Sequence, residues 1–176
     1  MKQGFYCLLV LVSMVACKRY TDPDPFTDDR LTNPYCNDPS AVNYNWGFPG
    51  KPDNSVCIYP TQLFEGQYIV NDTVWSTTQA PLLVSEFPLT ITAIDTVKLQ
   101  LKGFCDTVIH TARASRFLQF NLDTVVGYGQ QYCAGKDTLM VSGSKAFISD
   151  TNGFDITYTL FTDTGVVQHR GRATKQ

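Results

Sequence analysis

Cysteine is the residue type whose chemistry in this chain is easiest to predict. Four cysteines follow the N-terminal region, namely Cys36, Cys57, Cys105 and Cys133. No C-x-x-C motif and no Cys/His pair with ligand spacing occurs, so a zinc site is not expected. In an oxidising compartment four cysteines allow three disulfide connectivities. Nearest-neighbour pairing would give Cys36–Cys57 and Cys105–Cys133, and a Cys36–Cys133 link would contradict it.

Residue patterns for catalysis are sparse. The only histidines are His110 and His169, and neither belongs to a nucleophile–base motif. His110 shares a predicted strand face with Val108 and Ala112, which is typical of an ordinary half-buried side chain. The chain has no G-x-S-x-G, no glycine-rich phosphate loop and no H-E-x-x-H. Two strand-end Asp residues could still converge as a carboxylate pair, but we expect no enzyme, no metal and no cofactor.

The dipeptide Asp-Thr occurs seven times after residue 70. Asp favours turns and Thr favours strands, so the repeat is expected where a turn leads into a strand. In five copies an aliphatic residue follows, and this triplet resembles the Bacteroidetes O-glycosylation sequon of Asp, then Ser or Thr, then an apolar residue. A sugar is bulky and would have to lie at the surface. The resemblance implies candidate acceptors at Thr73, Thr96, Thr107, Thr124 and Thr138, and turn chemistry alone is the alternative.

The N-terminus predicts export. Lys2 precedes the uncharged run Phe5–Ala16, which is shorter than the roughly 20 apolar residues that span a bilayer and is typical of a signal peptide. Met14-Val15-Ala16-Cys17 then resembles a bacterial lipobox, although the usual first residue is Leu. The resemblance implies a lipoprotein signal over residues 1–16 and acylation, for example with palmitate, at Cys17. A plain secretory signal with an incidental cysteine is the alternative.

Charge and the residues after Cys17 bear on partners and location. Loss of Lys2 would leave 13 of the 14 basic side chains against 16 acidic ones, a formal balance of 13 − 16 = −3. Lys and Arg are not clustered, so no nucleic acid is expected as a partner. Acidic residues after the lipidated cysteine often act in Bacteroidetes as an address to the cell surface, whereas Lys18-Arg19-Tyr20 stand here. We expect a cell-envelope lipoprotein, held by lipid at the outer membrane, with its facing side left open.

Two segments separate the lipidation site from the main domain. Residues 17–35 are rich in Asp, Thr and Pro and predict a flexible tether. Residues 36–60 are rich in turn formers and predict an irregular module stapled by a disulfide. The pattern C-x-D-P-x-A-x-N-Y, then D-x-S-x-C-x-Y, resembles a small disulfide module of Bacteroidetes secreted proteins, from which Asn54 and Val56 depart. Asp38 and Asp53 are too few acidic ligands for a calcium site.

From residue 64 to 176 the sequence changes to short runs in which apolar and polar residues alternate. Such runs predict half-buried antiparallel strands, clearest at Thr96–Lys102 and Phe154–Leu160. Further strands are predicted at Gln67–Val74, Leu89–Ile94, Thr107–Thr111, Phe117–Leu122, Thr138–Ser142, Lys145–Ile148 and Val166–Ala173. The predicted fold class is therefore all-β, an antiparallel meandering barrel or sandwich of about eight strands.

Three short motifs in this region resemble the lipocalin-like lipoprotein domains common in Bacteroidetes. The motifs are Gly66-Gln67-Tyr68, Ile156-Thr157-Tyr158-Thr159 and Thr174-Lys175. The resemblance implies a small barrel and no particular activity.

Two non-enzymatic functions follow from such a barrel, and a hydrolase ranks below both. The first, which we favour from sequence, is an interaction or structural domain that contacts a protein or glycan. The second is a carrier of a small apolar ligand, because an eight-stranded barrel can either be filled by side chains or hold one small ligand. Large side chains favour filling, and these are Tyr68, Phe117, Phe120, Phe154 and Tyr158.

Overall fold

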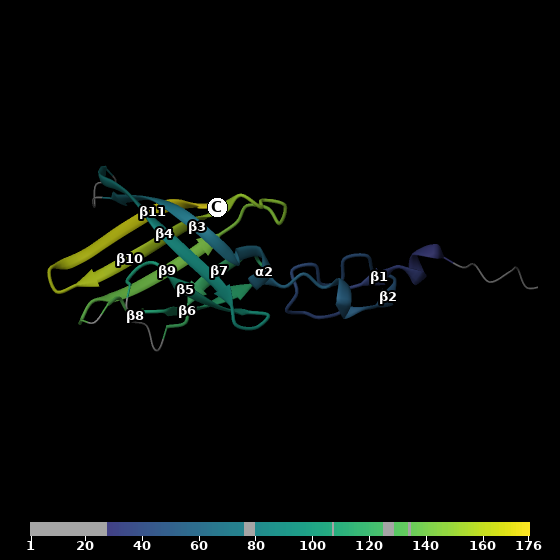
Figure 1. Ribbon diagram of the computed structural model, residues 1–176. Coiled ribbons are helices and arrows are strands. Elements are labelled where there is room, and N and C mark those ends of the chain that lie inside the picture. Colours follow the sequence, from purple (N-terminus) through teal and green to yellow (C-terminus); the bar gives the residue numbers. More distant parts are fainter. Residues whose placement is uncertain (1–27, 76–79, 107, 125–128, 134) are drawn as a thin grey trace, which may run out of the picture.

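The computed structural model describes residues 28–75, 80–106, 108–124, 129–133 and 135–176. The predicted signal peptide, Cys17, most of the predicted tether and Thr107 lie outside the described residues. No described helix is both long and apolar enough to cross a membrane. The described chain forms a small N-terminal module followed by a β-barrel (Figure 1).

The barrel is a closed antiparallel sheet of eight strands. In chain order these are β3 (Gly66–Trp75), β4 (Pro81–Ala93), β5 (Lys98–Lys102), β6 (His110–Ser115), β7 (Gln119–Leu122), β9 (Thr138–Ser144), β10 (Gly153–Thr162) and β11 (Gly165–Lys175). Each pairs with the next, and β11 returns to β3, which closes the sheet. A two-residue strand, β8 (Gln130–Gln131), pairs with the start of β9. The predicted all-β class is confirmed, and the fold is the barrel rather than the sandwich.

Alternation along the strands places one set of side chains inside. In β5, Leu99 and Leu101 are buried between exposed polar residues, and in β10, Phe154, Ile156 and Tyr158 are buried in the same way. This is the pattern that a strand with one face on a core requires. The predicted orientation of both runs is confirmed.

Several predicted strand boundaries were wrong. β4 begins at Pro81, well before the predicted start at Leu89. Its pairing with β5 covers only Thr90 to Ala93, so at Pro88 the strand has a hydrogen-bonded neighbour on one side only and tolerates a proline. β6 and β7 begin later than predicted, at His110 and Gln119, and a turn occupies the residues before β7.

The predicted strand Lys145–Ile148 was also wrong, because this segment is a loop. Lys145 is buried, and its ammonium donates hydrogen bonds to the carbonyl oxygens of Asp150 at 2.6 Å and Gly153 at 3.0 Å. A buried ammonium needs such acceptors. The side chain therefore fixes the loop between β9 and β10 instead of alternating with neighbours in a strand.

Aromatic side chains fill one end of the barrel. The short helix α2 (Pro60–Phe64) lies there, and the Phe64 ring packs edge to face on Phe120 at 5.0 Å and Phe154 at 5.6 Å between centroids. Tyr68 lies 5.0 Å from Phe154 and donates its hydroxyl to the Phe64 carbonyl oxygen at 2.8 Å. All four rings are fully buried. This end is closed, as the sequence predicted for Tyr68, Phe120 and Phe154, and Phe64 of α2 adds a ring that the sequence did not predict.

Phe120 and Phe117 were predicted to share this role, but only Phe120 has it. Phe120 pairs in register with Gly143, where any β-carbon would collide with the Phe120 ring. Phe117 lies in the turn before β7 and is 70% exposed. Its predicted place in the interior was wrong, because the turn reverses the chain before alternation begins.

The N-terminal module is held by the predicted disulfide Cys36–Cys57. Strand β1 (Pro34–Tyr35) pairs in parallel with β2 (Lys51–Pro52), and 3-10 turns cover Asp29–Thr32 and Asn54–Val56. The buried Asn43 amide donates to the Val56 carbonyl oxygen and accepts from the Ile58 amide, both at 2.8 Å. The ordered module therefore includes the last residues of the segment predicted as a tether.

The module and the filled end of the barrel lie on the same side of the molecule. In Figure 1 the module extends from the end that carries α2, whereas the β10–β11 turn and the outer ends of β3 and β4 lie at the opposite end. We call this opposite end the open end.

Candidate ligand-binding site at the open end of the barrel

A buried carboxylate lies inside the barrel toward its open end. Asp72 belongs to β3, where it alternates with the inward residues Tyr68 and Val70, and it is 1% exposed. Its register partner in β11 is Gly171, which has no side chain to fill the interior beside the carboxylate. The turn-to-strand junction predicted for the Asp-Thr pairs was wrong at Asp72, which lies within β3, whereas the strand predicted at Gln67–Val74 is confirmed.

Three side chains donate hydrogen bonds to one oxygen of this carboxylate. Asp72 Oδ2 accepts from the Tyr158 hydroxyl at 2.8 Å and from the Ser85 hydroxyl at 3.5 Å, and His169 Nδ1 lies 2.8 Å away. Tyr158 and His169 are register partners in β10 and β11, and their rings stack with centroids 4.1 Å apart and planes 13° apart. Four strands therefore converge on one carboxylate oxygen.

The other polar atoms of this cluster lack partners. Asp72 Oδ1 and His169 Nε2 are buried and have no hydrogen-bond partner in the described part of the chain. Leaving a buried polar atom unsatisfied costs about 1–3 kcal/mol, so native structures keep few of them. Two such atoms in one cluster reduce the stability of the fold. The cluster is therefore a candidate functional site.

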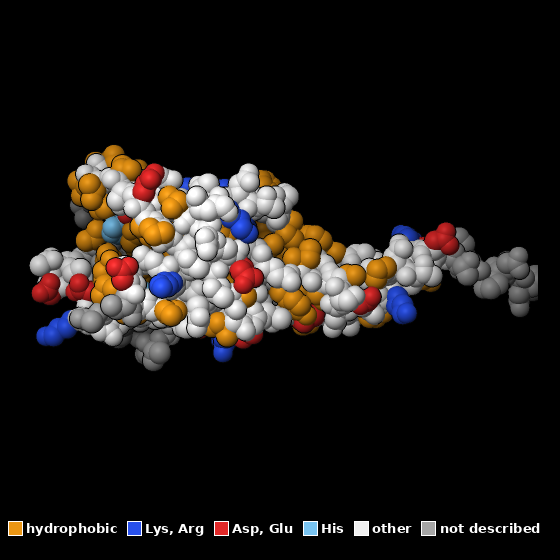
Figure 2. Space-filling model, viewed as in Figure 1, with side chains coloured by type: hydrophobic (Ala, Val, Ile, Leu, Met, Phe, Trp, Pro, Cys, Tyr) orange, Lys and Arg blue, Asp and Glu red, His pale blue; other side chains and the backbone are white. Residues whose placement is uncertain are grey.

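A cavity of about 270 Å³ adjoins the cluster. Besides Asp72, Tyr158, His169 and Ser85, its lining consists of Val74, Leu83, Phe87, Gly103, Phe104, Tyr132 and Leu160. Hydrophobic side chains also gather on the surface at this end of the molecule, as Figure 2 shows. The most exposed of them on β4 are Leu82, Leu83 and Val84, each more than half exposed. A mostly apolar cavity with a few convergent polar groups is the usual form of a small-molecule site.

No protein-family model matches this chain, and neither does any curated protein. What the cavity can bind is therefore inferred from the residues that line it.

The second predicted disulfide, Cys105–Cys133, joins two segments that each place an aromatic residue in the wall of this cavity. It joins the connection after β5 to the connection between β8 and β9, as predicted. Phe104 precedes one cysteine and Tyr132 precedes the other, and both line the cavity. The disulfide thus holds together two aromatic residues from segments that are not strands.

Burial controls the protonation of the aromatic hydroxyls in the barrel. Burial, together with the hydrogen bond to Asp72, raises the pKa of Tyr158 well above its ordinary value. Burial likewise raises the pKa of Tyr68 to about 12. Both hydroxyls therefore remain protonated and act as donors at neutral pH.

His110 is a separate buried group near the cavity wall. Its ring is fully buried, contacts the edge of Phe104 and lies with Nε2 3.0 Å from the Gln131 carbonyl oxygen. Burial lowers its pKa below the ordinary value of 6.5. It shares its face with the buried Ala112, as predicted, and it does not contact the Asp72 cluster.

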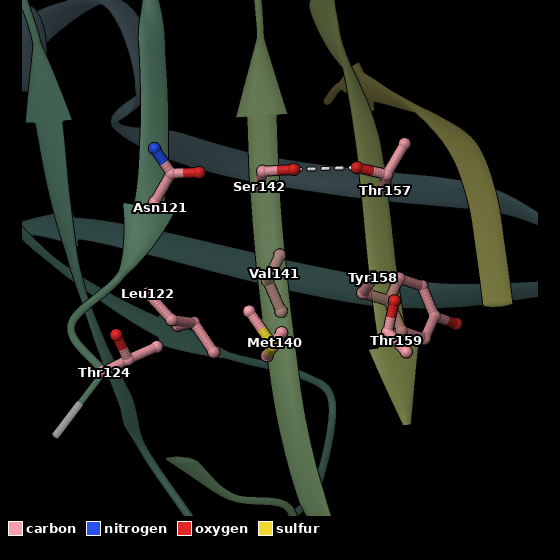
Figure 3. A pocket seen from close by; sticks show the side chains of 9 residues that line it. All are labelled: Asn121, Leu122, Thr124, Met140, Val141, Ser142, Thr157, Tyr158 and Thr159. Carbon is pink, nitrogen blue, oxygen red and sulfur yellow. Dashed lines mark hydrogen bonds between the residues drawn. The ribbon is translucent and has the colours of Figure 1, made fainter. Parts of the chain in front are cut away.

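A second cavity, of about 360 Å³, lies on the outer surface over β7, β9 and β10. Asn121, Met140, Thr157 and Thr159 line it, and a hydrogen bond of 2.7 Å joins the Ser142 and Thr157 hydroxyls (Figure 3). It opens where β7 ends at Leu122 while β9 continues. It holds no described polar atom that is buried and unpartnered, so it is the weaker candidate despite its larger volume.

The Asp-Thr pairs divide into two groups. Five of the seven Asp residues lie in or beside a turn or bend, whereas Asp72 and Asp123 do not. Asp95 shows why the first group does, since its Oδ1 accepts from the amides of Val97 and Lys98, both at 2.7 Å. Among the candidate sugar acceptors, Thr96 and Thr124 are exposed, whereas Thr73 and Thr138 are half-buried. Hydrogen bonds from nearby backbone amides support turn chemistry at Asp95 and Asp150, whereas the pair that begins with Asp72 lies within a strand.

The sequence contains a pattern that predicts this cluster, although the Asp-Thr pair at Asp72 also fits turn chemistry. In the predicted strand Gln67–Val74, alternation puts Asp72 on the same face as Tyr68 and Val70, so a carboxylate faces the core. His169 alternates in the same way with Gly171 and Ala173. A charged residue at an inward position of a strand is the pattern that would have identified the cluster.

Proposed function

We propose that this protein is a lipid-anchored envelope protein whose barrel binds a small molecule in the cavity at its open end. Of the two functions that the sequence left open, the carrier has the stronger support. The interior is filled at one end only, and the cavity at the other end contains buried polar atoms that lack partners.

The single observation that carries the proposal is Asp72 Oδ1, buried beside a cavity of about 270 Å³ and without a hydrogen-bond partner. A barrel that needed only a filled core would place an apolar side chain here. Ligand sites in proteins commonly measure about 300–1,000 Å³, so this cavity suits a ligand at the small end of that range.

The proposed anchor rests on the lipobox-like sequence that ends at Cys17. A Cys17→Ser variant should move the protein from the membrane fraction to the soluble fraction, and labelled palmitate should no longer enter it. Retention of the variant in the membrane fraction would contradict the lipid anchor without bearing on the cavity.

Ligand binding can be tested by filling each cavity in turn. Leu160 lines the inner cavity, and its neighbour Thr159 lines the outer one. Leu160→Trp should abolish binding of an environment-sensitive apolar dye to the full chain in detergent, whereas Thr159→Trp should leave binding unchanged. Native mass spectrometry of the wild-type chain, isolated gently from its own cells, should detect a bound small molecule.

The opposite outcome for the two Trp variants would assign the ligand to the outer cavity. Absence of both dye binding and a co-isolated small molecule in the wild type would refute the carrier function. Circular dichroism of each variant provides the control for folding.

A further inference from the structure

We infer that the ligand is a small organic amine, bound as its cation with the ammonium against Asp72 and its apolar part along the cavity wall. This inference rests on the proposed function and adds the chemical class of the ligand. Three features of the site support it, namely the charge of the cavity, the acceptor atoms that lack partners and the aromatic residues around them.

Charge is the first argument. The residues that line the cavity include one carboxylate and no Lys or Arg, and the one basic side chain among them, His169, is already paired with that carboxylate at 2.8 Å. Arg170, the sequence neighbour of His169, is exposed, and its guanidinium lies over the Trp75 ring, 6.0 Å from the centroid. A ligand with its own carboxylate would bring two anions together in an apolar space, which is strongly unfavourable. The cavity therefore disfavours fatty acids and favours cations.

Unpartnered acceptors are the second argument. The donors from Tyr158 and Ser85 both point to Asp72 Oδ2, so Oδ1 is left as an acceptor without a donor. His169 directs Nδ1 toward the same carboxylate, so its Nε2 is left to exchange a hydrogen bond with a ligand. That nitrogen also lacks a partner in the described part of the chain. A ligand that completes the cluster must donate hydrogen bonds, which an ammonium group does in up to three directions.

The aromatic lining is the third argument. Four aromatic residues, Phe87, Phe104, Tyr132 and Tyr158, line the same cavity as Asp72. The faces of aromatic rings attract organic cations, and aromatic rings around a carboxylate are suited to an amine. Val74, Leu83 and Leu160 complete the wall and fit an alkyl or aryl group.

Three probes with similar apolar parts and different charges can test this inference. They are 2-phenylethylamine, 2-phenylethanol and 3-phenylpropionate, titrated calorimetrically into the full chain at pH 7. The amine should bind at least about tenfold more tightly than the alcohol, because hydrogen bonds to charged groups contribute more than neutral ones. The carboxylate should show no measurable binding.

Asp72→Asn keeps the shape of the side chain and removes its charge. The variant should lose about tenfold or more in affinity for the amine and bind the alcohol as the wild type does. Glu86→Gln is the matched control, because Glu86 is exposed on β4 beside Ser85 and does not line the cavity. It should leave all three affinities unchanged.

The outcomes separate this inference from the proposed function. Equal wild-type affinities for amine and alcohol, or tighter binding of the carboxylate, would overturn the amine assignment while the carrier function stands. Should Asp72→Asn fail to fold, the wild-type probe series still decides, because it needs no variant. Failure of all three probes and of the apolar dye would refute the carrier function itself.

Discussion

The two ends of the barrel interior are built by the same strands and have different side chains. At the end beside α2, Phe154 of β10 packs against the rings of Phe64 and Tyr68. Toward the open end of the same strand, Tyr158 instead donates a hydrogen bond to Asp72 beside a cavity. The strands themselves do not account for this difference, because β3, β10 and β11 run through both ends.

Within one small fold, the filled end contributes to stability and the open end provides the proposed binding site. Buried aromatic rings remove about 150–250 Å² each from water and dominate the energetics of a core. Buried polar atoms without partners reduce stability. The filled end can therefore support an open end that would be unfavourable alone, and variants at the two ends should affect different properties.

The largest expected effect is at the filled end. Phe120→Ala should lower the free energy of unfolding by about 3–5 kcal/mol, because it leaves a cavity among fully buried rings. Urea unfolding measures this. The control is Phe117→Ala, which removes the same side chain from an exposed turn and should change the free energy by less than about 0.5 kcal/mol. Equal losses of unfolding free energy for the two variants would contradict the assignment of Phe120 to a filled end of the interior.

The two disulfides give the next comparison. They close segments of 21 and 28 residues, so replacing either pair with Ser should lower the free energy of unfolding by about 3 kcal/mol. Only the Cys105/Cys133 variant should also weaken binding of 2-phenylethylamine, because that bridge holds Phe104 and Tyr132 in the cavity wall. Calorimetry of both variants tests this, and the contrary finding is an equal loss of affinity when Cys36 and Cys57 are replaced.

A smaller effect is expected from one added methyl group. Gly143→Ala would place a β-carbon in the space of the Phe120 ring. Overpacking of this kind costs about 1–3 kcal/mol. Thermal unfolding should show the loss, and the double variant Gly143→Ala with Phe120→Leu should recover part of it. No recovery would mean that Phe120 is not the residue displaced.

The smallest expected effect concerns pH and His110. Because burial lowers its pKa below 6.5, the unfolded chain binds a proton more readily than the folded chain. The stability that His110 contributes is present above pH 6.5 and is lost as the pH falls toward the lower folded pKa. Carboxyl groups with a lowered pKa, such as Asp95 and Asp150, titrate below this range.

The test for His110 is urea unfolding at pH 7 and pH 5.5. The wild type should lose more stability between these values than His110→Gln, whose amide can still donate to the Gln131 carbonyl oxygen. An identical loss in both proteins would show that another group titrates in this range.

Most of the strands could be predicted from sequence, because a barrel strand with one face on the core must alternate. The runs in β5 and β10 are of this kind, and Asp95 shows that turn chemistry is equally local. Nearest-neighbour pairing also gave both disulfides, since each joins segments close in sequence. Local patterns were sufficient wherever the structure depends on neighbours along the chain.

The rest depends on contacts between distant residues. Closure into a barrel requires β3 to pair with β11, about a hundred residues later in the chain, and no local pattern specifies that pairing. The Asp72 cluster depends on it as well, because His169 comes from β11. At Asp72 the local rule for Asp-Thr pairs fails, and such failures are expected at functional sites.

The position of the open end determines how a ligand can arrive. The module extends from the filled end, so the cavity lies at the far end of the barrel from the module. A water-soluble molecule would reach the entrance by diffusion. The module therefore lies away from the path that such a ligand would take into the barrel.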